Sequence, residues 1–305
     1  MTPPPFYGAD RPEDIRWITA ADGKRLRAGH WPKGQKGTIL LFTGRTEFLE
    51  KYTDVAQTFA ALGWGMASLD WRGQGLSERL LEDPQIGHVG DFSEYQRDVD
   101  AFLAYCARCD LPKPWVMFAH SMGGAIGLRA LHNGFRPAAA VFSAPMWDIQ
   151  LRPVLRILAK LAYVIAKPIG LAARYAPTQG PHEPMVFEGN PLTHDQARLD
   201  WMKEQAKADP LLTLGGPSIS WVYHALTECQ ALAALPAPKG VPTLGFVGTD
   251  ERVVSRERIA EIMATWPDGQ FLEIEGAAHE VLMETDPLRD QALRAIAQIL
   301  GRVAP

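Results

Sequence analysis

Short β-type runs alternate with helical patterns along most of this chain, and this alternation restricts the fold more than any other feature. Helical spacing of apolar residues fills intervals such as 51–63 and 94–109. The runs with the length and bounding residues of strands lie at 15–20, 25–31, 37–44, 64–71, 114–120, 138–145, 241–250 and 269–279. The alternation predicts an α/β fold, with a parallel sheet covered by helices on both faces.

The alternation stops after Pro145 and resumes in the last quarter of the chain. Residues 146–236 read as helices and loops rich in Leu, Ala, Pro and Trp, without a convincing strand. The simplest organisation is one core domain, residues 1–145 and 237–305, interrupted by a helical insertion at 146–236. A chain of 305 residues with 47% hydrophobic residues can bury such a core.

Composition and charge exclude several classes of partner. The 31 Lys and Arg against 35 Asp and Glu give a formal net charge of −4, without the dense basic run that nucleic-acid binding requires. The three cysteines, Cys106, Cys109 and Cys229, suit a reducing compartment. The first two resemble a C-x-x-C pair, but there is no second ligand pair, so we expect no zinc site.

The chain shows no signal for export. Its first residues lack a basic start followed by an apolar run, so a cytoplasmic location is expected. The most lipophilic stretch, residues 151–177, is repeatedly interrupted by arginine and lysine and is therefore no transmembrane span. Its amphipathic character would still allow peripheral contact with the inner face of a membrane.

Ser121 stands where a buried strand meets a helix, in the sequence "PWVMFAHSMGGAIGLRALHNG". Small residues flank it two positions before and after, Ala119 and Gly123, which departs from the G-x-S-x-G pattern only in the alanine. This is the context of a nucleophile elbow, where strand and helix approach closely and the serine is exposed. The sequence predicts that Ser121 is a nucleophile.

A serine hydroxyl needs a base to accept its proton and an acid to orient that base. On this kind of scaffold these follow the serine in the order acid, histidine. We assign them to Asp250, the last residue of the run 241–250, and to His279, the last residue of the run 269–279. Glu251 is an adjacent alternative for the acid. His120, next to the serine, is expected to be structural.

The oxyanion of an acyl-transfer intermediate needs two backbone N–H donors. We assign them to Met122, after the serine, and to Arg45, in the loop that follows the third strand.

The pattern Gly73-x-Gly75 does not continue into a dinucleotide fingerprint, because Glu78 occupies the place of the third glycine. No metal and no organic cofactor is expected.

Several motifs in this order resemble one branch of a known superfamily. They are "LLFTGRTEFLEKY", "LDWRGQGLSERL", "GHVGDFSEYQRDVDAFL", "AHSMGG", "GTDERVV" and "GAAHEVLME". Together they resemble the monoacylglycerol lipase and bacterial lysophospholipase branch of the α/β-hydrolases. The resemblance implies an eight-stranded, mostly parallel sheet with a helical cap inserted after the sixth strand. It also implies the same triad of Ser121, Asp250 and His279.

The resemblance implies a serine ester hydrolase that cleaves a lysophospholipid or a monoacylglycerol through an acyl-enzyme. The residues expected to line the substrate pocket are Gly44, Met146, Trp147, Trp201 and Trp221. The alternative for those in the cap is simple packing on the core. The family resemblance also admits a proline iminopeptidase-like aminopeptidase, with Glu47 or Asp148 holding the substrate ammonium, or another small-substrate carboxylesterase or thioesterase. A receptor with little turnover is a rival of another class.

The loop before the oxyanion position departs from its relatives, with Thr43-Gly44 followed by Arg45 and Thr46. A guanidinium there would suit a substrate phosphate, which would favour lysophospholipids over monoacylglycerols. The alternative is an outward arginine paired with Glu47 or Glu50.

Overall fold

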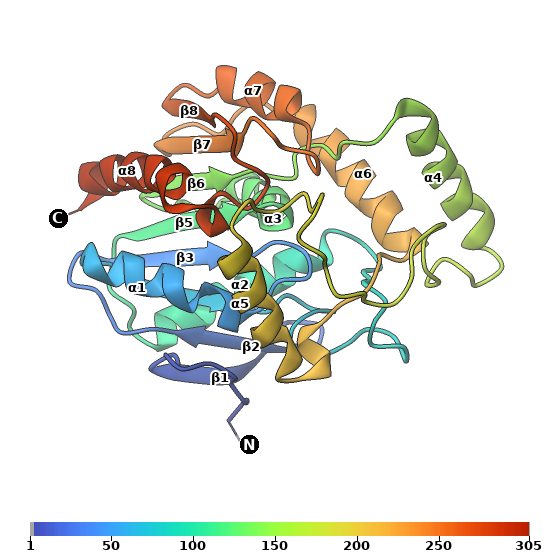
Figure 1. The fold of residues 1–305 in the computed structure, drawn as a ribbon, viewed down its shortest axis with the longest axis horizontal. Helices are drawn as coiled ribbons and strands as arrows, with labels where there is room; N and C mark the ends of the chain where they lie inside the picture. Colours follow the sequence, from blue (N-terminus) through green and yellow to red (C-terminus); the bar gives the residue numbers. More distant parts are fainter. Residues whose placement is uncertain (1–2, 305) are drawn as a thin grey trace.

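The structure is a computed structural model that describes residues 3–304. A single eight-stranded sheet forms its centre (Figure 1). The strand order is β1-β2-β4-β3-β5-β6-β7-β8. β2 runs antiparallel to both β1 and β4, and the other neighbours are parallel. The strands are β1 (Asp14–Thr19), β2 (Arg25–His30), β3 (Thr38–Phe42), β4 (Gly65–Leu69), β5 (Trp115–His120), β6 (Ala139–Ser143), β7 (Thr243–Gly248) and β8 (Gly269–Ile274). The predicted fold class is confirmed.

Helices cover the sheet on both faces. One apolar core lies under α1 (Thr53–Ala61) and α8 (Asp286–Val303). The other lies under α2 (Glu94–Arg108), α3 (Met122–His132) and α7 (Arg256–Ala264). β3, β4 and β6 are buried along their whole length, as expected for parallel strands covered on two sides. This arrangement brings the carboxyl ends of β5, β7 and β8 to one edge of the sheet.

The chain between β6 and β7 carries helices and loops and adds no strand to the described sheet. Its elements are α4 (Pro153–Ala166), α5 (Gln196–Lys207), the short 3-10 helix η2 (Pro210–Leu212) and α6 (Ile219–Ala233). α6 packs against the core through Trp221, Ala225 and Cys229. α4 packs on α6, where Tyr163 and Tyr223 stack with ring centroids 3.9 Å apart. That residues 146–236 form a separate cap domain stays a prediction.

Helix α4 stands away from the sheet (Figure 1). Its side chains expose an apolar surface. Of its residues, only Tyr163 and Ala166 are buried. Nine of the twelve large hydrophobic side chains that are exposed within residues 3–304 lie between Val154 and Leu171. No helix in the described part of the chain combines the length and the apolar character needed to cross a membrane.

Candidate active site

The turn from β5 into α3 holds Ser121 in a strained backbone conformation, with φ 49° and ψ −118°. A positive φ is costly for a residue with a side chain and is typical of functional turns. Gly123 explains why only small residues fit here, because a Cβ at that position would lie 2.1 Å from the carbonyl oxygen of Phe42. The serine therefore sits at the tight strand-to-helix turn that the sequence predicts.

Ser121, His279 and Glu251 form one hydrogen-bonded chain. Ser121 Oγ lies 2.9 Å from His279 Nε2, and His279 Nδ1 lies 2.7 Å from Glu251 Oε2. All three residues are buried. For Nε2 to accept the serine proton, Nδ1 must carry its own proton and donate it to Glu251. The side chains are thus joined in the order serine, histidine, carboxylate.

The prediction that Asp250 orients His279 is wrong in its geometry, because Asp250 points away from the histidine. Its carboxylate binds Arg252 at 2.8 Å and His194 Nε2 at 3.2 Å, and its side chain is 34% exposed. The hydrogen bond from Arg252 holds the pKa of Asp250 below its usual range. Asp250 lies in the turn that follows β7, and its carboxylate and that of the next residue, Glu251, face different partners.

The carboxylate of Glu251 is held in place by backbone amides of the residues that follow it. Its Oε1 accepts hydrogen bonds from the amides of Val253 at 2.6 Å and Val254 at 3.1 Å, which leaves Oε2 for His279. Burial raises the pKa of Glu251, but the hydrogen bonds from His279 and from the two amides outweigh it, so the net pKa is lowered. The carboxylate is therefore ionised and held in one orientation.

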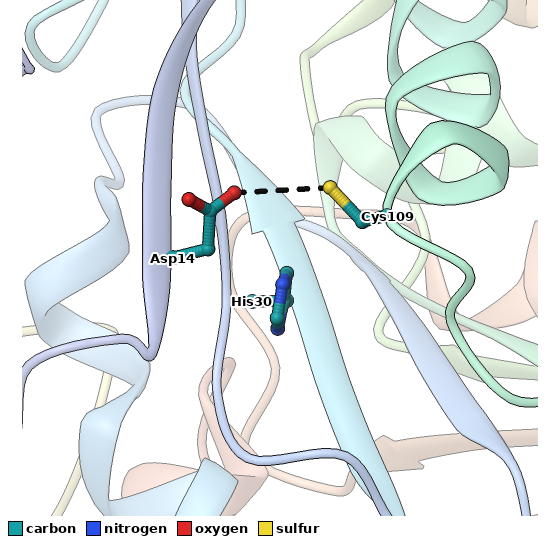
Figure 2. A group of neighbouring side chains, drawn as sticks. All are labelled: Asp14, His30 and Cys109. Atoms are coloured by element: carbon teal, nitrogen blue, oxygen red, sulfur yellow. Dashed lines mark hydrogen bonds between the residues drawn. The ribbon is translucent and has the colours of Figure 1, made fainter.

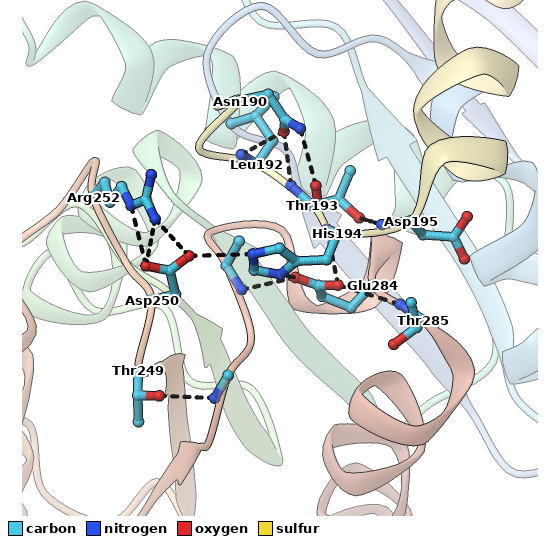
Figure 3. A network of polar contacts seen from close by, with 12 residues as sticks. Asn190, Leu192, Thr193, His194, Asp195, Thr249, Asp250, Arg252, Glu284 and Thr285 are labelled. Atoms are coloured by element: carbon cyan, nitrogen blue, oxygen red, sulfur yellow. Dashed lines mark hydrogen bonds and ion pairs between the residues drawn. The ribbon is translucent and has the colours of Figure 1, made fainter. Parts of the chain in front are cut away.

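The loop that carries His279 is anchored by a second acidic residue, Glu284, which the sequence did not single out (Figure 3). Its buried carboxylate accepts from the amide of Ala278 at 2.8 Å, and from the amide and Nδ1 of His194 at 3.0 and 2.8 Å. The amide of His279 also donates to the carbonyl of Pro191 at 3.2 Å. The insertion thereby helps to position the histidine loop. No local pattern links residue 194 to residue 284.

A pocket of about 640 Å³ opens above Ser121 and His279. Three of the predicted substrate-binding residues line it: Gly44, Met146 and Trp221. Trp147 lies elsewhere, fully buried against Phe142 and Trp266 in the core. Trp201 on α5 is half-buried and is not part of the lining. A packing role, the stated alternative, accounts for Trp147.

The two predicted oxyanion donors lie at the start of α3 and in the loop after β3. Met122 is the first residue of α3, where an amide has no acceptor within its helix. Arg45 follows Gly44 after β3 and lines the pocket together with Ser121. Their role at an oxyanion stays a prediction.

The Arg45 side chain does not pair with either of the glutamates considered for it. Nη2 donates to the carbonyl of Gly215 at 2.6 Å, and the guanidinium lies over the Trp221 ring at 5.2 Å. Glu47 binds Lys51 at 2.6 Å. Glu50 binds Arg27 at 2.7 Å. The outward, carboxylate-paired arginine is therefore excluded.

A buried cluster of charges lies beneath the pocket. The Lys51 ammonium is 2.6 Å from Glu47 and 2.7 Å from Glu280, and Glu47 also accepts from the hydroxyl of Tyr52 at 2.8 Å. His120 lines the pocket beside this cluster, and its Nδ1 lies 3.0 Å from the carbonyl of Ser143. Burial lowers the pKa of His120.

Within residues 3–304, each of two groups of side chains brings three potential metal ligands together. In the first, Glu47, His120 and Glu280, the Lys51 ammonium already bridges the carboxylates. The second is Asp14, His30 and Cys109 (Figure 2).

In this second group two of the side chains already have other partners. Asp14 accepts from Arg16 at 2.7 Å and from Tyr105 at 3.1 Å. His30 Nδ1 lies 3.0 Å from the carbonyl of Trp31. Neither group provides an argument for a metal, and the expectation of none stays a prediction.

Comparison with known proteins gives one family and several relatives. Residues 33–286 match the serine aminopeptidase S33 family. The chain is 34% identical over 291 residues to lysophospholipase L2 of Escherichia coli, covering 91% of this chain and 83% of that protein. It is 28% identical to the probable lysophospholipase L2 of Haemophilus influenzae, covering 86% and 83%. A soluble variant of the Saccharomyces cerevisiae monoglyceride lipase shares the fold, with a TM-score of 0.75, 18% identity and full coverage of both chains.

Proposed function

Because this chain belongs to the serine aminopeptidase S33 family of α/β-hydrolases, we propose that it hydrolyses the ester of a single-acyl-chain lipid, a lysophospholipid or a monoacylglycerol. The observation that carries the proposal is the hydrogen-bonded chain of Ser121, His279 and Glu251, whose serine and histidine line the pocket. The names of the lysophospholipase L2 relatives support the lipid substrate.

In the proposed reaction Ser121 Oγ attacks the acyl carbonyl while His279 Nε2 takes its proton. The same nitrogen then protonates the leaving alcohol, and it later activates the water that hydrolyses the acyl-enzyme. Glu251 replaces Asp250 as the acid that orients His279 and stabilises the imidazolium. The amides of Met122 and Arg45 donate to the oxyanion.

The pocket suits an acyl chain more than a peptide. Apolar side chains from the core and the insertion form part of its wall, among them Phe48, Met146, Leu214, Trp221 and Val254. An extended hydrocarbon gains free energy of about 0.8 kcal/mol for each methylene that it buries in such a wall.

The aminopeptidase alternative needs a free carboxylate for the substrate ammonium. Glu47 binds the Lys51 ammonium at 2.6 Å and shares it with Glu280. Asp148 is neutralised by Arg156 at 2.6 Å. Both candidate carboxylates thus already hold a cation, which favours the ester over the peptide substrate.

Helix α4 supplies the proposed contact with a membrane, where single-chain lipids reside. Its exposed apolar side chains adjoin Arg152, Lys160 and Lys167, and residues 151–176 include no Asp or Glu. An apolar face bordered by cations suits the interface of an anionic lipid layer. We propose peripheral docking on the inner face of the membrane through α4.

The test is turnover of p-nitrophenyl esters, monoacylglycerols and lysophosphatidyl lipids by the wild type and by Ser121→Ala. Turnover that the substitution abolishes, with a preference for one lipid class, supports the proposal. Proline amidomethylcoumarin serves as the peptidase substrate. Hydrolysis of that amide alone, or labelling of Ser121 by a fluorophosphonate without turnover of any lipid ester, would show that the substrate class is wrong.

A further inference from the structure

The geometry points to the Arg45 side chain as the residue that binds the phosphate of the substrate and so selects lysophospholipids over monoacylglycerols. This inference rests on the proposed function, because it concerns the head group of the same lipid ester. The amide of Arg45 is already predicted to bind the oxyanion. The inference gives the side chain of the same residue a role in specificity.

Arg45 is a guanidinium without a carboxylate partner. Its protein contacts are the carbonyl of Gly215 and the ring of Trp221. Within residues 3–304 its Nε is buried without an acceptor, and its Nη1 makes no hydrogen bond. Burial lowers the pKa of Arg45 to about 10, so the side chain remains a cation at neutral pH. A partly desolvated cation without an anion is costly, and an anionic ligand would relieve that cost.

The two most deeply buried arginines of the described residues are paired with acids. Arg27 binds Glu50 and Asp70, each at 2.7 Å. Arg72 binds Asp98 at 2.7 Å and also binds Asp22 at 2.7 Å. The half-buried Arg45 and Arg79 both lack an acid partner, but only Arg45 lines the pocket, where a ligand can supply the missing charge.

The surroundings of Arg45 fit a ligand-binding role. It is the only arginine or lysine among the described residues that line the pocket. Gly87 makes room for its guanidinium, since a Cβ there would lie 2.4 Å from Nη2. The acidic residues of the lining are Glu47, Glu183 and Glu280, of which Glu47 and Glu280 share the Lys51 ammonium. Among the described lining residues Arg45 is therefore the one guanidinium or ammonium that can receive an anionic group directly.

The position also matches the chemistry of the two substrate classes. The Arg45 amide is assigned to the oxyanion, so its side chain starts beside the scissile ester. In a lysophospholipid only the glycerol separates that ester from the phosphate, whereas a monoacylglycerol carries a neutral hydroxyl at the same place. A guanidinium binds phosphate oxygens through charge-assisted hydrogen bonds, which a hydroxyl cannot match.

The measurement is the ratio of kcat/KM for a lysophosphatidyl lipid to that for a monoacylglycerol of the same acyl chain. We expect Arg45→Gln to lower this ratio about tenfold to a hundredfold, the value of one hydrogen bond to a charged group. Arg45→Lys should lower it less, because the charge remains without the planar donors.

Arg79→Gln is the matched control. Arg79 also binds carbonyls of the same segment of the insertion, those of Leu211 and Thr213, and it too has no carboxylate partner. It does not line the pocket. We expect this variant to keep the wild-type ratio. An equal fall in both variants would assign the effect to the position of the 211–215 segment and would overturn the inference.

A second experiment, inhibition by competing ligands, distinguishes a site for a lipid head group from a site for free phosphate. Glycerophosphocholine should compete with the monoacylglycerol in the wild type and lose that effect in Arg45→Gln. If inorganic phosphate competes through Arg45 while the substrate ratio is unchanged by Arg45→Gln, the site takes a free anion and the inference is overturned. If the wild type hydrolyses neither lipid class, the proposed function itself has failed.

Discussion

Replacing Glu251 tests which of two adjacent carboxylates serves His279. Glu251→Gln keeps the size of the side chain, and the amide carbonyl can still accept from the amides of Val253 and Val254. The amide NH₂ then faces His279 Nδ1 in place of the carboxylate oxygen at 2.7 Å. Two donors cannot share one hydrogen bond, so the histidine must change its tautomer or turn. Either change removes the base from Ser121.

The expected loss is large. Replacing the acid of such a triad by its amide lowers kcat by about 10⁴-fold, which is about 5 kcal/mol of the activation free energy. The fold should survive, because the substitution removes a charge without opening a cavity.

Asp250→Asn is the control with the opposite expectation. Its carboxylate is partly exposed and its contacts are with Arg252 and His194, which are both exposed. Such surface ion pairs contribute about 0–1 kcal/mol. We expect kcat within about twofold of the wild type, the range typical of surface substitutions.

The assay is kcat/KM on a p-nitrophenyl ester, together with the labelling rate of Ser121 by a fluorophosphonate. Circular dichroism and urea unfolding show that both variants are folded. A loss of 10³-fold or more in Asp250→Asn, with Glu251→Gln near the wild type, would refute the assignment of the acid.

Three further predictions concern packing, membrane contact and pH. Gly123→Ala should destabilise the protein by about 1–3 kcal/mol in urea unfolding, because its Cβ would meet a main-chain oxygen of β3 at 2.1 Å; an unchanged midpoint would contradict that close approach. Ile157→Asp with Val164→Asp should reduce co-sedimentation with anionic vesicles, whereas Val186→Asp, equally exposed but outside α4, should not; equal effects would exclude docking through α4. The lowered pKa of Glu251 means that its stabilisation is present above the unfolded-state value of about 4.5 and is lost as pH falls. The stability gap between wild type and Glu251→Gln should therefore narrow as pH falls below about 4.5 and through the lowered folded-state pKa, and a gap that widens there would contradict the sign of the shift.

The sequence by itself determined the architecture and the position of the proposed nucleophile. Strand length, turn residues and helical spacing are local properties, so all eight strands were found without tertiary information. The same holds for Ser121, because the small residues around it are required by one turn. His279 follows from its position after the last strand, at the edge of the sheet where the carboxyl ends of the strands meet.

Only the tertiary structure decided which side chains meet. Asp250 and Glu251 are chemically alike and adjacent, and the direction of each depends on how the chain leaves β7 and on the amides of Val253 and Val254. His194 and Glu284 are joined across ninety residues, which no local pattern encodes. Trp147 and Trp221 are both apolar, yet one fills the core and the other faces the pocket. Contacts of this kind depend on side-chain direction and packing between distant segments, whereas the order of the elements depends on neighbours along the chain.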